Sequence, residues 1–190
     1  MKLTLTTAAL VLTLNALAPA QDIDAMKAHG QGLIEAFGGA LKTELVAAIE
    51  AGGAVNAVEV CKLRAPEIAS TVSEASDGWT ISRSSHRLRN PLNAPDAYTA
   101  AAIETFLSRV EAGEPAGSLA QAGIFEEGGQ RVFRMVKAIP TGAVCLQCHG
   151  GEEIAPEVAT VLDALYPQDR ARGFGEGDMR GVFTLRKPLD

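Results

Sequence analysis

The chain has 190 residues, of which 47% are hydrophobic and 21% are charged, a size and composition typical of one globular domain. Its 23 acidic residues outnumber 17 lysines and arginines, and the net charge is −6. An acidic chain without a basic run is not typical of proteins that bind nucleic acid or anionic lipid.

Residues 1–20 have the pattern of a secretory signal peptide. Lys2 is the only charge, an apolar run follows it, and small residues end the segment. The alternative is an uncleaved anchor helix, but the run contains Thr and Asn and is short for a bilayer span. We therefore predict cleavage before Gln21, export to the periplasm of a bacterium, and one mature domain over residues 21–190 that has no contact with the membrane.

The first half of the mature chain predicts helices. Apolar residues recur every three or four positions over residues 33–49 and again over 58–72, with Gly52-Gly53 between the two segments. Pro66 removes one hydrogen bond from the second helix, which predicts a kink or a split there. Cys61 falls on the apolar stripe of this second helix.

The second half predicts strands with further helices between them. The expected elements are a strand over 79–83, a helix capped by Asp96, a hairpin over 124–139 around Gly128-Gly129, a short helix over 155–166, a glycine-rich loop over 173–181 and a last strand over 182–188. Helices followed by antiparallel strands predict an α+β domain with one sheet.

The cysteines carry the clearest chemical signal. Cys61, Cys145 and Cys148 are an odd set, which does not fit a scaffold of paired disulfides. The stretch from Cys145 to His149 matches Cys-x-x-Cys-His, in which each thiol adds to one haem vinyl group and the histidine becomes an axial ligand of the iron. We predict one haem c attached through Cys145 and Cys148, with His149 on the iron.

Two other uses of this motif remain as alternatives. A structural zinc site needs a fourth ligand, often from a second cysteine pair, which is missing here. A redox dithiol would follow a strand at the start of a helix in a βαβ unit. The flanks IPTGAV and HGGEE favour a loop beside a flat cofactor instead, and the export signal agrees with haem attachment outside the cytoplasm.

The residues alone leave the second axial ligand open. Methionine or histidine is usual in electron-transfer cytochromes. Cys61 is the one unpaired thiol in an oxidising compartment, and Lys62 and Arg64 could favour its thiolate, although a free cysteine is more commonly just a small buried apolar residue. The candidates are Met26, His29, Cys61, His86, Met135 and Met179.

Four motifs follow one another along the chain: CKLRAP (61–66), RSSHRLRNPLNAPDAY (83–98), CLQCHG (145–150) and YPQDRARGFGEGDMRG (166–181). In this order they resemble a family of single-haem c-type domains with a PAS-like fold. The resemblance implies an antiparallel sheet flanked by helices, with iron held between His149 and Cys61. His86 departs from the family pattern, which leaves room for another ligand or a pH-dependent switch.

Arg83, Arg87, Arg89 and Asn90 form a cationic segment in this otherwise acidic chain. We predict that they hold the haem propionates through charge-assisted hydrogen bonds. The alternative is that these residues pair with surface carboxylates and shape a turn.

The resemblance implies redox or gas sensing, because relatives place this domain ahead of signalling modules. We expect a sensor in which a labile Cys61–iron bond is the switch and a separate redox or signalling partner protein carries the output. The alternative is a periplasmic electron-transfer cytochrome c with six-coordinate iron in both redox states. A peroxidase would need a distal pair such as His86 with Arg83 or Arg87, for which no convincing position exists, so we expect no enzymatic activity.

Overall fold

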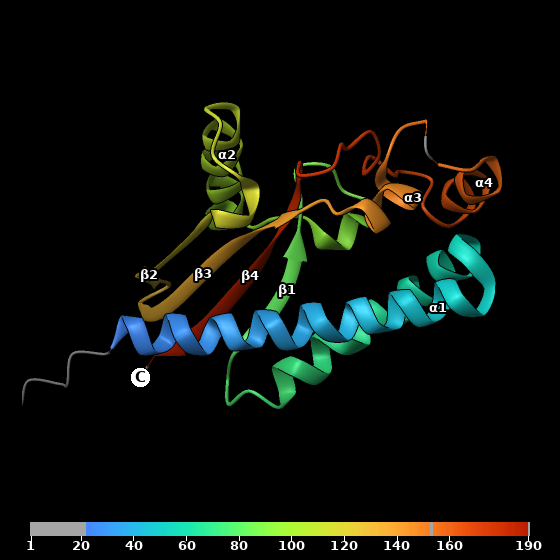
Figure 1. Ribbon diagram of the computed structural model, residues 1–190. Coiled ribbons are helices and arrows are strands. Elements are labelled where there is room, and N and C mark those ends of the chain that lie inside the picture. The colour runs from blue at the N-terminus through green and yellow to red at the C-terminus, as the bar shows by residue number, and fades with distance from the viewer. Residues whose placement is uncertain (1–21, 153, 190) are drawn as a thin grey trace, which may run out of the picture.

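The computed structural model describes residues 22–152 and 154–189. The signal peptide predicted over residues 1–20 lies outside the described residues. Within them the chain forms one antiparallel sheet of four strands with helices on both faces, as Figure 1 shows. The α+β prediction is confirmed. No helix in this part of the chain is long and apolar enough to cross a bilayer.

Helix α1 (Ile23–Glu74) is a hairpin of two long arms that join at Gly52-Gly53 (Figure 1). Gly53 has a φ of 73°, a left-handed conformation that favours glycine. Asn56 supports the turn, because its side-chain amide donates a 2.8 Å hydrogen bond to the carbonyl oxygen of Ala48. The second arm continues through Pro66 with helical backbone, so the proline does not split it.

The sheet has the strand order β1-β4-β3-β2, and every neighbouring pair is antiparallel. The predicted hairpin is confirmed: Gly128 and Gly129 join β2 to β3 with φ of 61° and 81°, the signs that a two-residue hairpin turn needs. The last strand starts earlier than predicted and takes in the end of the expected glycine-rich loop. The strands are β1 (Thr80–Ser84), β2 (Ala120–Glu127), β3 (Gln130–Pro140) and β4 (Met179–Leu189).

Each face of the sheet is buried against one helix. Side chains alternate along β3, so Phe133 and Met135 pack in the layer under α1 while Val136 and Ala138 pack under α2 (Ala97–Glu111). Asp96 caps α2 as predicted, since its carboxylate accepts a 2.8 Å hydrogen bond from the backbone N–H of Thr99.

Helix α4 (Pro156–Leu165) packs against the α1 hairpin and not against the sheet. Its Val158 and Leu162 form a separate small core with Val58 of α1, and Cys148 and Tyr166 border that core. Figure 1 shows α4 and the neighbouring α3 beyond one end of the sheet, above the end of α1 where its arms join. The cysteine motif is therefore held between the sheet and the α1–α4 pair.

Candidate functional site

The cysteine motif lies on a short helical segment. The 3-10 helix η3 (Ala143–Cys145) leads directly into α3 (Leu146–His149), which differs from the loop that the flanking residues predicted. In a helical turn, residues three apart lie on one face, so Cys145 and Cys148 are neighbours there. Both thiols are partly buried, and neither forms a disulfide with the other described cysteine, Cys61.

Both ring nitrogens of His149 have contacts within the protein, one short and one long. Its Nδ1 lies 2.8 Å from the carbonyl oxygen of Ala171, to which an Nδ1–H donates. Nε2 then carries the lone pair and lies 3.5 Å from a guanidinium nitrogen of Arg89. Burial, followed by the charges of Arg89 and Arg180, holds the pKa of His149 well below its usual range. The neutral imidazole is thus ready to bind a metal through Nε2.

Arg89 and Asp169 clamp the segment that positions His149. The Arg89 guanidinium donates to the Asp169 carboxylate at 3.2 Å and to the carbonyl oxygens of Cys148 and Ala171. The Asp169 side chain is only 2% exposed. Burial alone would raise its pKa, but the hydrogen bond from the Ala171 N–H and those from arginines lower it. The ionised carboxylate therefore holds Arg89 in place.

Cys61 on the second arm of α1 lies near the cysteine motif. Burial raises the pKa of the Cys61 thiol, and the nearby guanidinium of Arg83 opposes this. Burial also raises the pKa of Cys148, and the charge of Cys61 contributes in the same direction. The next residue, Lys62, lies 5.5 Å from the ring centre of Tyr166, which anchors this arm to the end of α4. The fold thus brings Cys61 into the same cluster as Cys148.

Arg180 joins this cluster because of an irregularity in the sheet. The pairing of β3 with β4 shifts by one residue near the start of β4, and Arg180 has no partner on β3. Such a bulge redirects a side chain. Gly181 allows β1 to come close, since a Cβ there would lie 2.5 Å from the carbonyl oxygen of Ser84. The thiol of Cys145 acts on the pKa of Arg180, so the two side chains lie close together, and the Nε of Arg180 is buried without a hydrogen-bond partner among the described residues.

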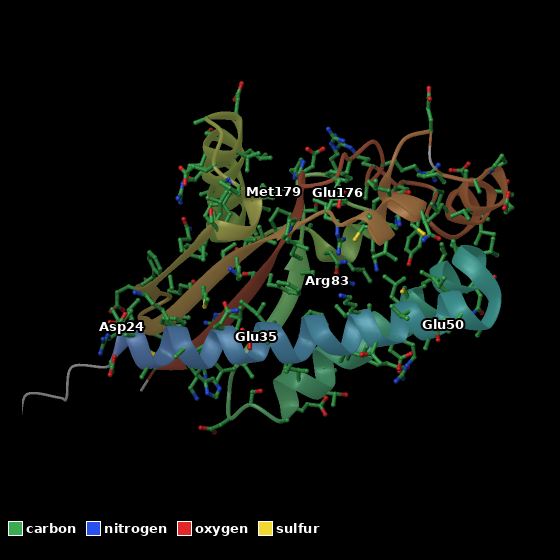
Figure 2. All side chains as sticks on the ribbon, viewed as in Figure 1. Asp24, Glu35, Glu50, Arg83, Glu176 and Met179 are labelled. Atoms are coloured by element: carbon green, nitrogen blue, oxygen red, sulfur yellow. The ribbon has the colours of Figure 1, made fainter. Side chains whose placement is uncertain are left out.

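Arg83 and Arg180 form no ion pair with any carboxylate of the described residues. In Figure 2 Arg83 lies between β1 and α1, and its guanidinium is 5.7 Å from the ring centre of Phe37. Burial and the charge of Arg180 lower the pKa of Arg83 to about 10. Burial also lowers the pKa of Arg180, against an opposing effect of Cys145. Both arginines are partly buried, and a cation that is shielded from water without an anion is costly, so this pair fits an anionic ligand.

The other residues predicted to bind propionates have partners within the protein. Arg87 donates to the carbonyl oxygens of Arg172 and Gly173, at 3.0 and 3.3 Å, and lies 4.8 Å from the ring centre of Phe174. Asn90 caps the 3-10 helix η1 (Pro91–Asn93) through its side-chain oxygen. The proposed role of Arg87, Arg89 and Asn90 in binding the cofactor stays a prediction.

Most of the alternative axial ligands belong to the core of the sheet. Met135 and Met179 are 5% and 3% exposed and pack in the two layers on either face. Met26 borders the layer under α1, and the His29 ring lies 5.0 Å from that of Trp79 in the same layer. The three methionines have the packing role that their apolar surroundings explain, whereas His29 is exposed.

His86 is the alternative ligand that lies nearer to His149. Its ring meets the edge of Phe174 at 5.8 Å, and the same Phe174 ring lies 6.3 Å from the ring of His149. Burial, followed by the charge of Arg87, lowers the pKa of His86. Its Nδ1 is buried and has no hydrogen-bond partner within the part of the chain that is described.

Sequence reasoning did not single out Asp169, Ala171, Tyr166 or Arg180 as site residues. All four lie in the stretch 166–181, whose only signal was its resemblance to a family motif. Backbone geometry decides their roles: the N–H of Phe174 donates to the carbonyl oxygen of His149 at 3.0 Å, which lays this stretch along the cysteine motif. Composition and spacing give no indication of such a contact.

Two cavities lie elsewhere in the described part of the chain. A groove of about 430 Å³ is lined by residues of both α1 arms, such as Glu44 and Arg64, and a smaller one of about 160 Å³ lies between β1, η1 and α2. Neither contains a cysteine or His149 among its lining residues. The chemistry of the donor side chains, and not the size of a cavity, identifies the site.

Comparisons with known proteins show the family and the fold of the chain. A family model described as Tll0287-like matches residues 7–188. Among solved structures, the chain is similar to the crystal structure of the cyanobacterial heme-protein Tll0287, with 24% sequence identity and a TM-score of 0.61. The match covers 85% of this chain and 96% of that one, and it shows a shared fold. No curated protein matches the chain.

Proposed function

Because the chain belongs to the Tll0287-like family, we propose that it is an exported haem c protein that senses redox state or a diatomic gas. The similar solved structure is described as a heme-protein. One observation carries the proposal for this chain: Cys61 lies near enough to Cys148 to affect the pKa of its thiol, and the Nε2 of the adjacent His149 has only a long 3.5 Å contact with Arg89.

The residues present fit a haem c. Cys145 and Cys148 would form the thioether links, and His149 would bind the iron through Nε2 because its Nδ1 is bonded to Ala171. Cys61 would be the opposite ligand. When bound, the cofactor supplies an iron whose oxidation state and ligands can change.

Cys61 would set the redox properties. A thiolate donates charge to the iron and stabilises the ferric state, so we expect a potential well below that of a His/Met cytochrome. Ferrous iron gains less from that charge, and Cys61 is therefore the ligand that we expect to leave on reduction. A diatomic gas could then bind in its place, and the freed arm of α1 would pass the change to a partner protein.

Spectra of the exported protein beside Cys61→Ser test the ligation. We expect the substitution to change both the ferric absorption and the spin-resonance spectrum. His86→Gln is the matched control for the alternative ligand and should leave both spectra unchanged. If Cys61→Ser leaves them unchanged and His86→Gln does not, the ligand is His86. Fractionation of the producing cells tests the periplasmic location.

Reduction followed by carbon monoxide or nitric oxide tests the sensor. Rapid binding of the gas on reduction supports it. Absence of binding, together with fast electron exchange, would instead indicate a periplasmic electron-transfer cytochrome c. Turnover of hydrogen peroxide would indicate a peroxidase-like enzyme, which we do not propose.

A further inference from the structure

We propose that Arg83 and Arg180 together bind the propionate carboxylates of the haem. This inference rests on the proposed function and names the residues that recognise the acidic groups of its cofactor. Of the four residues predicted to bind the propionates, Arg83 is kept, and Arg180 is added from a different part of the chain.

Arg83 and Arg180 have positive charges that no carboxylate of the described residues pairs with. Each residue is partly buried, and within the described ranges neither guanidinium forms an ion pair with a carboxylate. Arg89 lies in the same cluster but has the buried carboxylate of Asp169 as its partner. The cluster therefore holds two positive charges beyond what its own carboxylate neutralises. A ligand with two carboxylates would balance them.

The backbone holds Arg83 and Arg180 on the neighbouring strands β1 and β4. Arg83 pairs with Phe183 across the β1–β4 ladder, three residues along β4 from Arg180. The hydroxyl of Ser85 donates a 2.6 Å hydrogen bond to the carbonyl oxygen of Arg180. The close approach at Gly181 fixes the same contact. Their like charges face the same cluster because the fold places them there, at a cost that a bound anion offsets.

Cys145 lies close enough to Arg180 to affect the pKa of its guanidinium. When its S–H adds across a vinyl double bond, the sulfur binds one vinyl carbon and the hydrogen goes to the other. A thioether sulfur is a weaker acceptor than a thiol that can ionise, so attachment weakens the contact that Arg180 has. A guanidinium with free N–H groups binds a carboxylate through two parallel hydrogen bonds.

The test uses the exported, haem-loaded protein. Resonance Raman spectra contain propionate-bending bands, which respond to hydrogen bonds at the carboxylates. We expect these bands to shift in Arg83→Gln and in Arg180→Gln. The control Arg131→Gln, an exposed arginine of β3, should match the wild type. If both site variants also match it, the inference is wrong.

A competing role is that these arginines only neutralise the thiolate of Cys61. Repeating the substitutions in a Cys61→Ser background separates the two roles. Shifts of the propionate bands that persist without Cys61 support the inference, and shifts that vanish contradict it. If a glutamine variant folds by circular dichroism but carries no haem, the haem-free chain is titrated with added haem beside Arg131→Gln: binding weaker than in this control supports the inference, and equal binding contradicts it. Absence of haem from the wild type would instead reject the proposed function.

Discussion

Arg134 and the Arg83–Arg180 pair lie on opposite faces of the same sheet. Arg134 has carboxylate partners, and the pair has none among the described residues. Arg134 is 4% exposed and donates to the carboxylates of Asp96 and Glu127. Burial would lower its pKa, but these carboxylates outweigh burial and raise it. For Arg83 and Arg180 burial prevails, and the pKa of each is lowered.

Arg134 differs from Arg83 and Arg180 in having carboxylate partners, and not in whether its Nε has a hydrogen bond. Arg134 also has a buried Nε without a partner among the described residues. Its two terminal nitrogens nevertheless bond acids, and its guanidinium lies 4.7 Å from the ring centre of Tyr98. A buried arginine with its own carboxylates serves the fold, because removing either partner leaves an uncompensated charge. Arg83 and Arg180 are partly buried and have no such partners among the described residues, which fits a ligand that supplies the carboxylates.

Arg134→Gln removes the arginine that has carboxylate partners, and it should have the largest effect on the free energy of unfolding. Asp96 and Glu127 lose their common partner, and both remain partly exposed, which moderates the loss. We expect the free energy of unfolding to fall by about 3 kcal/mol, measured by urea denaturation of the haem-free chain. Arg131→Gln on the same strand should change it by less than about 0.5 kcal/mol. An equal loss in both variants would contradict the structural role of Arg134.

Asp169→Asn removes the carboxylate that pairs with Arg89 beside the cysteine motif, and it keeps the shape of the side chain. We expect a loss of about 2 kcal/mol in the same measurement. Asp163→Asn is the matched control, since Asp163 bonds Arg172 as Asp169 does but is 71% exposed. A loss as large in the control would mean that burial of the carboxylate is not what matters.

Acid should weaken the ion pairs that Arg134 forms with Asp96 and Glu127. Hydrogen bonding by Arg134 is the main cause of the lowered pKa of Glu127, and it adds to the effect of Thr99 on Asp96. A carboxyl whose pKa is lower in the folded chain stabilises it above its unfolded pKa and loses that contribution as the pH falls. We expect the free energy of unfolding to fall from about pH 5 downward, and to fall less steeply in Arg134→Gln. Parallel curves would contradict the pairing.

Local signals in the sequence were sufficient for much of the fold. Gly128-Gly129 predicted the hairpin, Asp96 predicted the start of α2, and Gly52-Gly53 predicted the turn of α1. Each of these depends on residues close together in the chain. The motif from Cys145 to His149 was equally local, and the haem attachment that its spacing predicted stays a prediction.

The rest of the site depends on contacts between distant segments. Arg180 appeared to belong to a glycine-rich loop, and its place in the cluster follows from a bulge in β4 that spacing does not predict. Asn90 and Arg87 appeared free to bind a ligand, but a backbone cap and carbonyl oxygens of a remote loop engage them. Charge counted along the sequence does not tell which arginines have partners.

Arg180→Gln should have the smallest effect on the haem-free chain, although it removes a charge from a buried place. Its guanidinium has no carboxylate to lose among the described residues, and a neutral amide is easier to bury. We expect the free energy of unfolding to stay within about 1 kcal/mol of the wild type or to rise. Arg83→Gln should behave alike, and urea denaturation beside Arg134→Gln measures all three. A loss above about 2 kcal/mol for Arg180→Gln would mean that the protein itself supplies its partner, and the contrast between the two faces of the sheet would fail.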